Sequence, residues 1–236
     1  MNASIPSARD KLLFTPGPLT TSLSVKQAML HDAGSWDSEF NGIVAGVRQK
    51  LLQLAGVSQE KGFEVIPMQG SGTFGVEAVI SSVVPPTGKL LVLANGAYGE
   101  RITQMALQLG IKHLVLRSAE NETADLHELK RVLQTDSQIT NVAVVHCETT
   151  TGILNPIEQI GPIVKEASRI LIVDAMSSFG AIPIDIEAIG IDYLISSANK
   201  CIEGVPGFSF VFARRGESGY TRSAGGARAA AQAIHR

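Results

Sequence analysis

The chain has 236 residues, of which 44% are hydrophobic and 18% are charged, and its formal net charge is −2. This composition is typical of a globular protein with one large domain or two small ones. The near-neutral charge gives no electrostatic reason to expect a nucleic acid or an anionic membrane as a partner. Residues 1–14 lack a signal-peptide core, no apolar run reaches transmembrane length, and two cysteines suggest no disulfide framework. We therefore expect a cytoplasmic protein.

Short apolar runs alternate with longer amphipathic segments along the chain. After a rigid Pro/Gly loop at residues 15–19, three- and four-residue apolar spacing predicts helices at 24–30 and 40–54. The only tryptophan, Trp36, lies between them, and we interpret it as a core anchor. Strands are then predicted at 63–67, 90–94, 113–116, 142–146, 170–173, 191–195 and 208–212, and helices at about 71–83, 101–109, 125–133 and 157–167. Pro162 predicts a break in the last of these helices.

The alternation of strands and helices predicts an α/β fold with a mostly parallel sheet, because the strands are continuously apolar rather than alternating. In such sheets, ligands bind beyond the carboxyl ends of the strands. Four clusters of polar or small residues follow predicted strand ends: GSGT at 70–73, ETTTG at 148–152, Asp174 and Lys200. These clusters are the candidate functional residues.

The first cluster matches the G-x-G-x-x-G pattern through Gly70, Gly72 and Gly75. A dinucleotide-binding fold also requires an acidic residue at the end of the next strand, but that strand ends in Asn95. The loop still offers what a phosphate monoester needs, namely backbone N–H groups at a helix start and nearby hydroxyls. A purely structural turn is the alternative.

Lys200 follows a strand and is surrounded by small and apolar residues, in YLISSANKCIEGVPG. Partial desolvation of a lysine lowers its proton affinity and makes it an amine nucleophile. A lysine, a strand-end carboxylate such as Asp174 and a phosphate loop are together the requirements of a pyridoxal phosphate site. Tyr98 is a candidate for stacking on the cofactor ring, and Thr149 is a candidate for bonding to the ring hydroxyl. Each residue also has a purely structural interpretation: a surface lysine, a turn carboxylate, a half-buried tyrosine and a turn hydroxyl.

A metal site is not expected. His146, Cys147 and Glu148 are consecutive, and adjacent strand residues point to opposite faces, so three of them do not converge easily on one ion. Cys201 is interpreted as a small packing residue, because no base for a cysteine nucleophile is evident.

Long stretches of the chain closely resemble the class V, fold-type I pyridoxal-phosphate aminotransferases. The resemblance covers roughly residues 12–214, and its motifs occur in the order of the family. The motifs are LLFTPGPLT (12–20), MQGSGTFGVEAV (68–79), NGAYGER (95–101), HCETTTGILNPI (146–157), LIVDAMSSFGAIPIDI (171–186) and DYLISSANKCIEGVPGFSFV (192–211).

The resemblance implies a pyridoxal 5'-phosphate cofactor and a role for each matching residue. Lys200 is expected to bond to the cofactor aldehyde and Asp174 to pair with the pyridine nitrogen. The phosphate is expected at Ser71, Gly72 and Thr73. Tyr98 is expected to stack on the ring, with Thr149 and Asn199 lining the cofactor.

Within this class, the motifs are most similar to the enzymes that transfer the amino group of 2-aminoethylphosphonate to pyruvate. The resemblance therefore implies 2-aminoethylphosphonate and pyruvate as substrates and a homodimer as the assembly. Three alternatives remain: an alanine–glyoxylate or serine–pyruvate type aminotransferase, an inactive cofactor-binding fragment and, more remotely, a dinucleotide-dependent oxidoreductase.

The last 21 residues depart from this resemblance, because ten of them are Gly or Ala and only one is acidic. The family is expected to continue here into the rest of its large domain and a C-terminal small domain that carries a substrate-binding arginine. We therefore expect a truncated or frameshifted chain with impaired activity. The expected organisation is an N-terminal segment with an active-site loop (1–30), an incomplete cofactor-binding large domain (31–215) and an anomalous tail (216–236).

Overall fold

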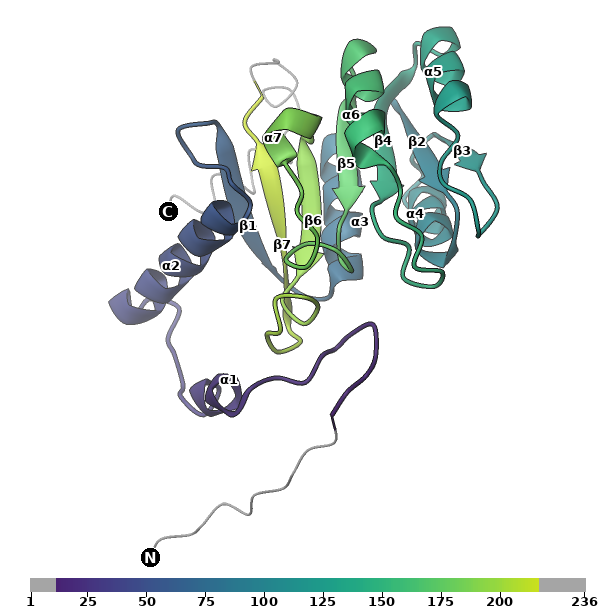
Figure 1. Ribbon diagram of the computed structural model, residues 1–236. Coiled ribbons are helices and arrows are strands. Elements are labelled where there is room, and N and C mark those ends of the chain that lie inside the picture. The colour runs from purple at the N-terminus through teal and green to yellow at the C-terminus, as the bar shows by residue number, and fades with distance from the viewer. Residues whose placement is uncertain (1–11, 217–236) are drawn as a thin grey trace, which may run out of the picture.

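The computed structural model describes residues 12–216 and consists, in this range, of one sheet with helices on both faces (Figure 1). The seven strands are β1 (Phe63–Gln69), β2 (Lys89–Ala94), β3 (His113–Arg117), β4 (Ile139–Val145), β5 (Ile170–Asp174), β6 (Tyr193–Ser197) and β7 (Phe208–Arg214). The helices are α1 (Leu23–Ala28), α2 (Ser38–Leu54), α3 (Gly72–Val83), α4 (Ala97–Gln108), α5 (Leu126–Thr135), α6 (Ile157–Glu166) and α7 (Ile186–Ile189).

The strand order is β1-β7-β6-β5-β4-β2-β3, and only β7 runs against its neighbours. The pairs β2–β3, β2–β4, β4–β5 and β5–β6 are all parallel. The predicted α/β fold with a mostly parallel sheet is thereby confirmed. Because β1 and β6 are both antiparallel to β7, the carboxyl ends of β1, β4, β5 and β6 lie at one edge of the sheet.

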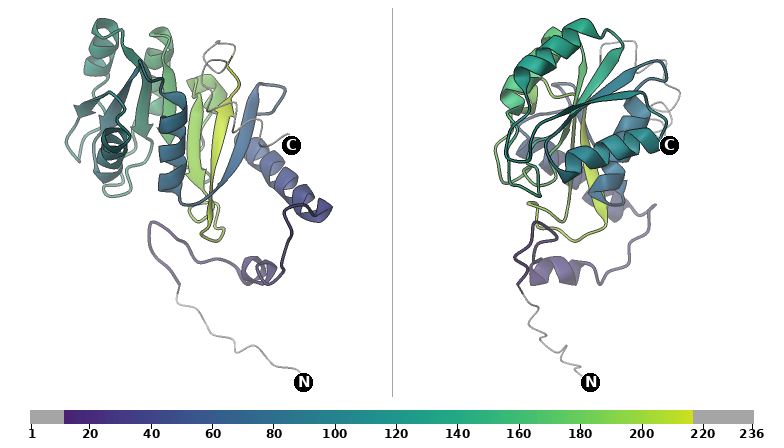
Figure 2. Two further views of the ribbon diagram at one scale, coloured as in Figure 1. Left: turned by 180° about the vertical axis from the view of Figure 1, so that it is seen from behind. Right: turned by 90° about the vertical axis from the view of Figure 1, so that its right-hand side faces the viewer.

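Each face of the sheet is covered by its own set of helices (Figure 2). Helices α3 and α4 pack on one face, where they contact strand residues such as Leu90 and Val92. Helices α2, α5, α6 and α7 pack on the other face, which includes Leu91 and Leu93. Neighbouring residues of one strand therefore enter opposite cores, which explains why the strands are continuously apolar.

Helix α6 runs through Pro162 without ending, so the predicted break is wrong. A proline inside a helix removes one hydrogen bond and crowds the preceding turn. Here the apolar face continues across it, because Ile160 and Val164 are both buried against the sheet. Tertiary packing of that face outweighs the local cost of the proline.

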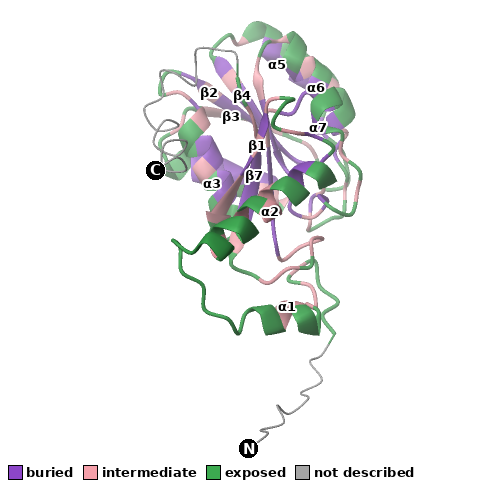
Figure 3. Ribbon diagram, turned by 90° about the vertical axis from the view of Figure 1, so that its left-hand side faces the viewer, coloured by how far each residue is buried: buried purple, intermediate pink, exposed green. Residues whose placement is uncertain are grey.

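Residues 12–37 cross the carboxyl edge of the sheet and lie outside its layers (Figure 3). Helix α1 has no buried residue, and the side chains of Phe14 and Trp36 are 92% and 89% exposed. The prediction that Trp36 anchors the core is therefore wrong, since no element of the described chain covers it. None of the helices in residues 12–216 is long and apolar enough to cross a bilayer.

Candidate functional site

The four predicted clusters lie at the carboxyl edge of the sheet, each at the end of a strand or within three residues of it. GSGT follows β1, ETTTG follows β4, Asp174 ends β5, and Lys200 lies in the turn after β6. Contacts between the loops bring them together. A Cβ atom at Gly72 would lie 2.4 Å from Sδ of Met176, and Thr149 Oγ1 lies 2.5 Å from Ser177 Oγ.

Asp174 is a buried carboxylate at the centre of this edge. Its side chain is 5% exposed, and Oδ1 accepts a hydrogen bond of 3.0 Å from the backbone N–H of Met176. Burial raises the pKa of the Asp174 carboxyl from 3.8 to about 6, and the negative charge of Glu148 adds to this rise. The charges of Arg101 and Lys200 oppose it without cancelling it. Such a carboxylate favours a cationic partner.

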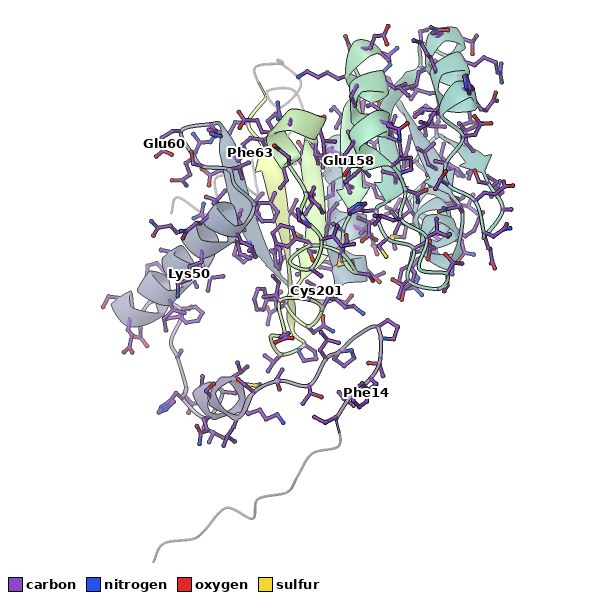
Figure 4. The ribbon with its side chains drawn as sticks, viewed as in Figure 1. Phe14, Lys50, Glu60, Phe63, Glu158 and Cys201 are labelled. Carbon is purple, nitrogen blue, oxygen red and sulfur yellow. The ribbon has the colours of Figure 1, made fainter. Side chains whose placement is uncertain are left out.

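Lys200 is half-buried, and the N-terminal loop lies against it. Its Nζ donates a 3.4 Å hydrogen bond to the carbonyl of Gly17, and Leu19 N donates to the carbonyl of Asn199 at 3.3 Å. Figure 4 labels Cys201, next to Lys200, at the end of the sheet that faces the segment carrying Phe14. The loop after β6 that carries Lys200 is therefore in contact with a loop about 180 residues earlier in the sequence.

Helix α3 presents its N-terminus to the same edge. Ser71 is its N-cap, and Ser71 Oγ accepts a 3.2 Å hydrogen bond from the N–H of Phe74. The N–H groups of Gly72 and Thr73 come first in the helix, where no earlier turn supplies a carbonyl for them. Because Ser71 and Thr73 are exposed, this helix start is open to an anionic ligand.

Tyr98 lies half-buried in the first turn of α4, at the same edge of the sheet. The guanidinium carbon of Arg101 is 4.7 Å from the centre of the Tyr98 ring, within cation–π range. Arg101 Nη1 also lies 3.4 Å from Thr73 Oγ1. Arg101 thus joins the start of α3 to the start of α4, a link that the sequence patterns did not predict.

Glu148 begins the predicted ETTTG cluster, but the sequence did not predict its role, because its side chain was weighed by itself only as a metal ligand. It is fully buried, and its carboxylate accepts hydrogen bonds from Tyr98 N at 3.2 Å and Gly99 N at 3.3 Å. His146, two residues earlier, faces a different neighbour, since its Nδ1 lies 2.9 Å from Ser178 Oγ. Burial lowers the pKa of the His146 imidazole. Among residues 12–216, no group of three or more potential ligands could hold a metal ion.

A reciprocal amide pair fixes the carboxyl end of β2. Asn95 Nδ2 donates to Asn155 Oδ1 at 3.1 Å, and Asn155 Nδ2 donates to Asn95 Oδ1 at 3.0 Å. Both side chains are almost completely buried. Asn95 occupies the position where a dinucleotide-binding fold carries its acidic residue. Its amide is turned inward and is already paired, which argues against that fold type.

The known proteins similar to this chain include many aminotransferases. The profile of the family "Aminotransferase class-V" matches residues 22–232. A curated relative, 2-aminoethylphosphonate–pyruvate transaminase of Bacillus cereus, is 57% identical over 206 residues, which are 87% of this chain and 56% of the relative. The chain thus spans about half the length of the curated relatives it matches.

Solved structures of aminotransferases also match this chain. The alanine–glyoxylate aminotransferase of Nostoc sp. matches with a TM-score of 0.80 and 29% identity, over 100% of this chain and 58% of that one. The pyridoxamine–pyruvate aminotransferase of Mesorhizobium loti matches with a TM-score of 0.78 and 27% identity, over 88% of this chain and 52% of that one. Since the family profile covers most of its residues, the chain belongs to the class-V aminotransferases, a family of pyridoxal-phosphate-dependent enzymes.

Proposed function

We propose that this chain provides the cofactor site of an aminotransferase that transfers the amino group of 2-aminoethylphosphonate to pyruvate, giving phosphonoacetaldehyde and L-alanine. The main support for the proposal is that the Lys200 amine, the buried Asp174 carboxylate and the open N-terminus of α3 all lie at one edge of the sheet. The choice of substrates is supported by 57% identity to a relative of that name.

The residues at this edge fit pyridoxal phosphate. The buried carboxylate of Asp174, with its raised pKa, suits the protonated pyridine nitrogen, a cation that would lower that pKa again. The N-terminus of α3, with Ser71, Gly72 and Thr73, suits the phosphate. Tyr98 would cover the ring, and Thr149 and Asn199 would line it. When bound, the cofactor supplies an aldehyde for covalent attachment and an electron sink.

Two side chains of this protein would then act on protons. Lys200 Nζ would hold the cofactor through its aldehyde, and the free amine of Lys200 would move a proton at the reacting carbon atoms. Asp174 would keep the proton on the ring nitrogen and so support the electron sink that the cofactor supplies. Burial of the Asp174 carboxylate strengthens this ion pair, because water does not screen it.

Borohydride reduction tests the assignment of Lys200. Pyridoxal phosphate is added to the purified chain, the imine is reduced, and the modified peptide is identified by mass spectrometry. We expect the pyridoxyl group on Lys200, and we expect Lys200→Ala to lose the imine absorbance. Lys89 is a suitable internal control, since its Nζ is paired with Asp136 at 2.6 Å at the start of β2. Labelling of Lys89 or Lys165 instead of Lys200 would contradict the proposal.

Amino-donor competition tests the substrates. Alanine formation from 2-aminoethylphosphonate and pyruvate is compared with transamination by alanine and glyoxylate, and by serine and pyruvate. Transamination with alanine or serine as the amino donor is the main alternative, because the alignment with the Nostoc alanine–glyoxylate aminotransferase covers the whole of this chain. Turnover with serine or alanine but not with the phosphonate would select that alternative. Cofactor binding without turnover of any donor would select an inactive cofactor-binding fragment.

We also propose that the protein is cytoplasmic and acts as a homodimer. The apolar side chains exposed on the N-terminal segment support a partner surface: Leu12, Phe14, Leu23, Met29, Leu30 and Trp36. Sedimentation at several concentrations tests the dimer, and a monomer at all of them would refute it.

The proposed domain organisation has an N-terminal segment with the active-site loop (1–30), a large domain (31–215) and a separate tail (216–236). Residues 1–11 and 217–236 lie outside the described part of the chain.

A further inference from the structure

Gly17 and Lys200 make a contact that leaves no room for a side chain at position 17. Lys200 Nζ lies 3.4 Å from the carbonyl oxygen of Gly17. A Cβ atom built on Gly17 would lie 2.3 Å from Cδ and 2.6 Å from Nζ of Lys200. The backbone at Gly17 also has a φ of +136°, which residues with a side chain rarely adopt. The backbone conformation therefore favours glycine here, and a side chain at position 17 would push the end of the Lys200 side chain out of its place.

The loop around Gly17 holds its carbonyl in place. Thr15 Oγ1 donates to the carbonyl of Pro18 at 2.9 Å and accepts from Gly17 N at 3.3 Å. Leu19 N donates to the carbonyl of Asn199, the residue before the lysine, at 3.3 Å. The loop is thus tied both to itself and to the backbone beside Lys200. Its carbonyl group is a fixed acceptor rather than a chance neighbour of a mobile side chain.

We propose that Gly17 is the positioning residue for the Lys200 amine: its carbonyl accepts the hydrogen bond of the uncombined amine, and its missing side chain leaves the space in which the lysine stem lies. The catalytic meaning of this arrangement rests on the proposed function, whereas the contact itself does not. A lysine has a long flexible stem, so an amine displaced from a cofactor needs a fixed acceptor to remain near the reacting carbon.

Chemical labelling of the cofactor-free, 236-residue chain measures this contact directly. Acetic anhydride acetylates accessible uncharged amines, and mass spectrometry reports the rate at Lys200 against the other lysines of the same sample. In Gly17→Ala, the new methyl group displaces the lysine from its site and so moves Nζ away from the backbone carbonyl of residue 17. We expect acetylation of Lys200 to become about two- to tenfold faster, the factor that one hydrogen bond supplies. The rate of imine formation with added pyridoxal phosphate should fall by a similar factor.

These opposite changes separate positioning from general loss of structure. A loosened fold would speed acetylation at many lysines, whereas the proposal predicts a change at Lys200 alone. Gly207→Ala is the matched control, because Gly207 has a similar φ of +148° but no atom within 4 Å of the position that a Cβ atom would take. It introduces the same backbone strain without touching Lys200, and its Lys200 rates should match those of the wild type.

Thr15→Val provides a second test that keeps glycine at position 17. It removes the hydrogen bonds that hold the loop, and since Thr15 is exposed, it should leave the fold intact. We expect a smaller increase in Lys200 acetylation than in Gly17→Ala. Wild-type rates at Lys200 in both Gly17→Ala and Thr15→Val would overturn the proposal. If no imine forms even in the wild type, the proposed function fails, but the acetylation rates still decide the role of Gly17.

Discussion

The carboxylate of Glu148, in the loop after β4, accepts hydrogen bonds from the backbone N–H groups of Tyr98 and Gly99 at the start of α4. An acidic side chain from a distant loop thereby does what an N-cap residue usually does from within the helix. The two segments approach so closely that a Cβ atom at Gly96 would lie 2.3 Å from Cγ of Glu148. Glu148 therefore sets the position of Tyr98, the proposed ring-stacking residue.

Replacing Glu148 by alanine should destabilise the protein. Two backbone N–H groups would lose their acceptor, and because Glu148 is fully buried, each unsatisfied group costs about 1–3 kcal/mol. Urea denaturation followed by circular dichroism measures the change. Glu148→Gln retains one acceptor oxygen and should cost less. Glu77→Ala, at an exposed position of α3, is the control and should change the free energy of unfolding by less than about 0.5 kcal/mol.

Asp174 should give the cofactor-free protein a defined pH dependence of stability. The carboxyl pKa in the folded protein is about 6, above its ordinary value of 3.8, so folding favours the protonated form. Below the lower value both states are protonated and there is no penalty. As the pH rises from the unfolded-state pKa to the folded-state pKa, Asp174 ionises first in the unfolded chain, and the free energy of unfolding falls. The total loss is about 3 kcal/mol once the pH is above the folded-state pKa.

Asp174→Asn tests this dependence, because an amide does not titrate. Wild type and variant are unfolded with urea at matched pH values from about 4 to 8, so that all other titrating groups cancel. The stability of the wild type relative to the variant should fall as the pH rises. A difference that is constant over this range would show that the carboxyl of Asp174 is not perturbed.

Replacing a helical glycine by alanine should lower the stability of the protein in α6 and raise it in α2. A Cβ atom at Gly161 would lie 2.0 Å from the carbonyl oxygen of Ile189, a backbone atom that cannot move aside easily. Gly161→Ala should therefore destabilise by about 1–3 kcal/mol. At Gly46, in the interior of α2, no atom lies within 4 Å of the new methyl group. Gly46→Ala should stabilise by about 0.5–1 kcal/mol. Thermal unfolding of both variants measures the two signs.

Sequence patterns were sufficient for the sheet and for the main clusters at its edge. Continuous apolar runs such as LLVLA predicted strands buried on both faces, and β2 is covered by helices on both sides. Polar residues after strand ends predicted the edge at which Asp174 and Lys200 lie. These predictions hold because they depend on local periodicity and on the direction of parallel strands.

The predictions that failed, and the contacts that were missed, depend on tertiary structure. Trp36 is apolar and single, yet whether it is covered depends on which element packs over it, and none in residues 12–216 does. Pro162 lies in a helix whose buried face outweighs the proline. Glu148 and Tyr98 are 50 residues apart, and no periodic pattern links a carboxylate to the backbone of a distant helix. The proposed roles of the cofactor residues remain predictions for the experiments above.

Arg101 should contribute to binding of the cofactor phosphate. Its guanidinium lies beside the Tyr98 ring and 3.4 Å from Thr73 Oγ1, next to the helix start proposed for the phosphate. Arg101→Gln should weaken binding of pyridoxal phosphate about three- to tenfold, since charge-assisted hydrogen bonds to phosphate are stronger than neutral ones. Binding of pyridoxal, which has no phosphate, should change less, as measured by absorbance titration. Arg131→Gln on α5, whose guanidinium pairs with Glu128, is the control. Equal weakening for both ligands would assign Arg101 to support of Tyr98 instead.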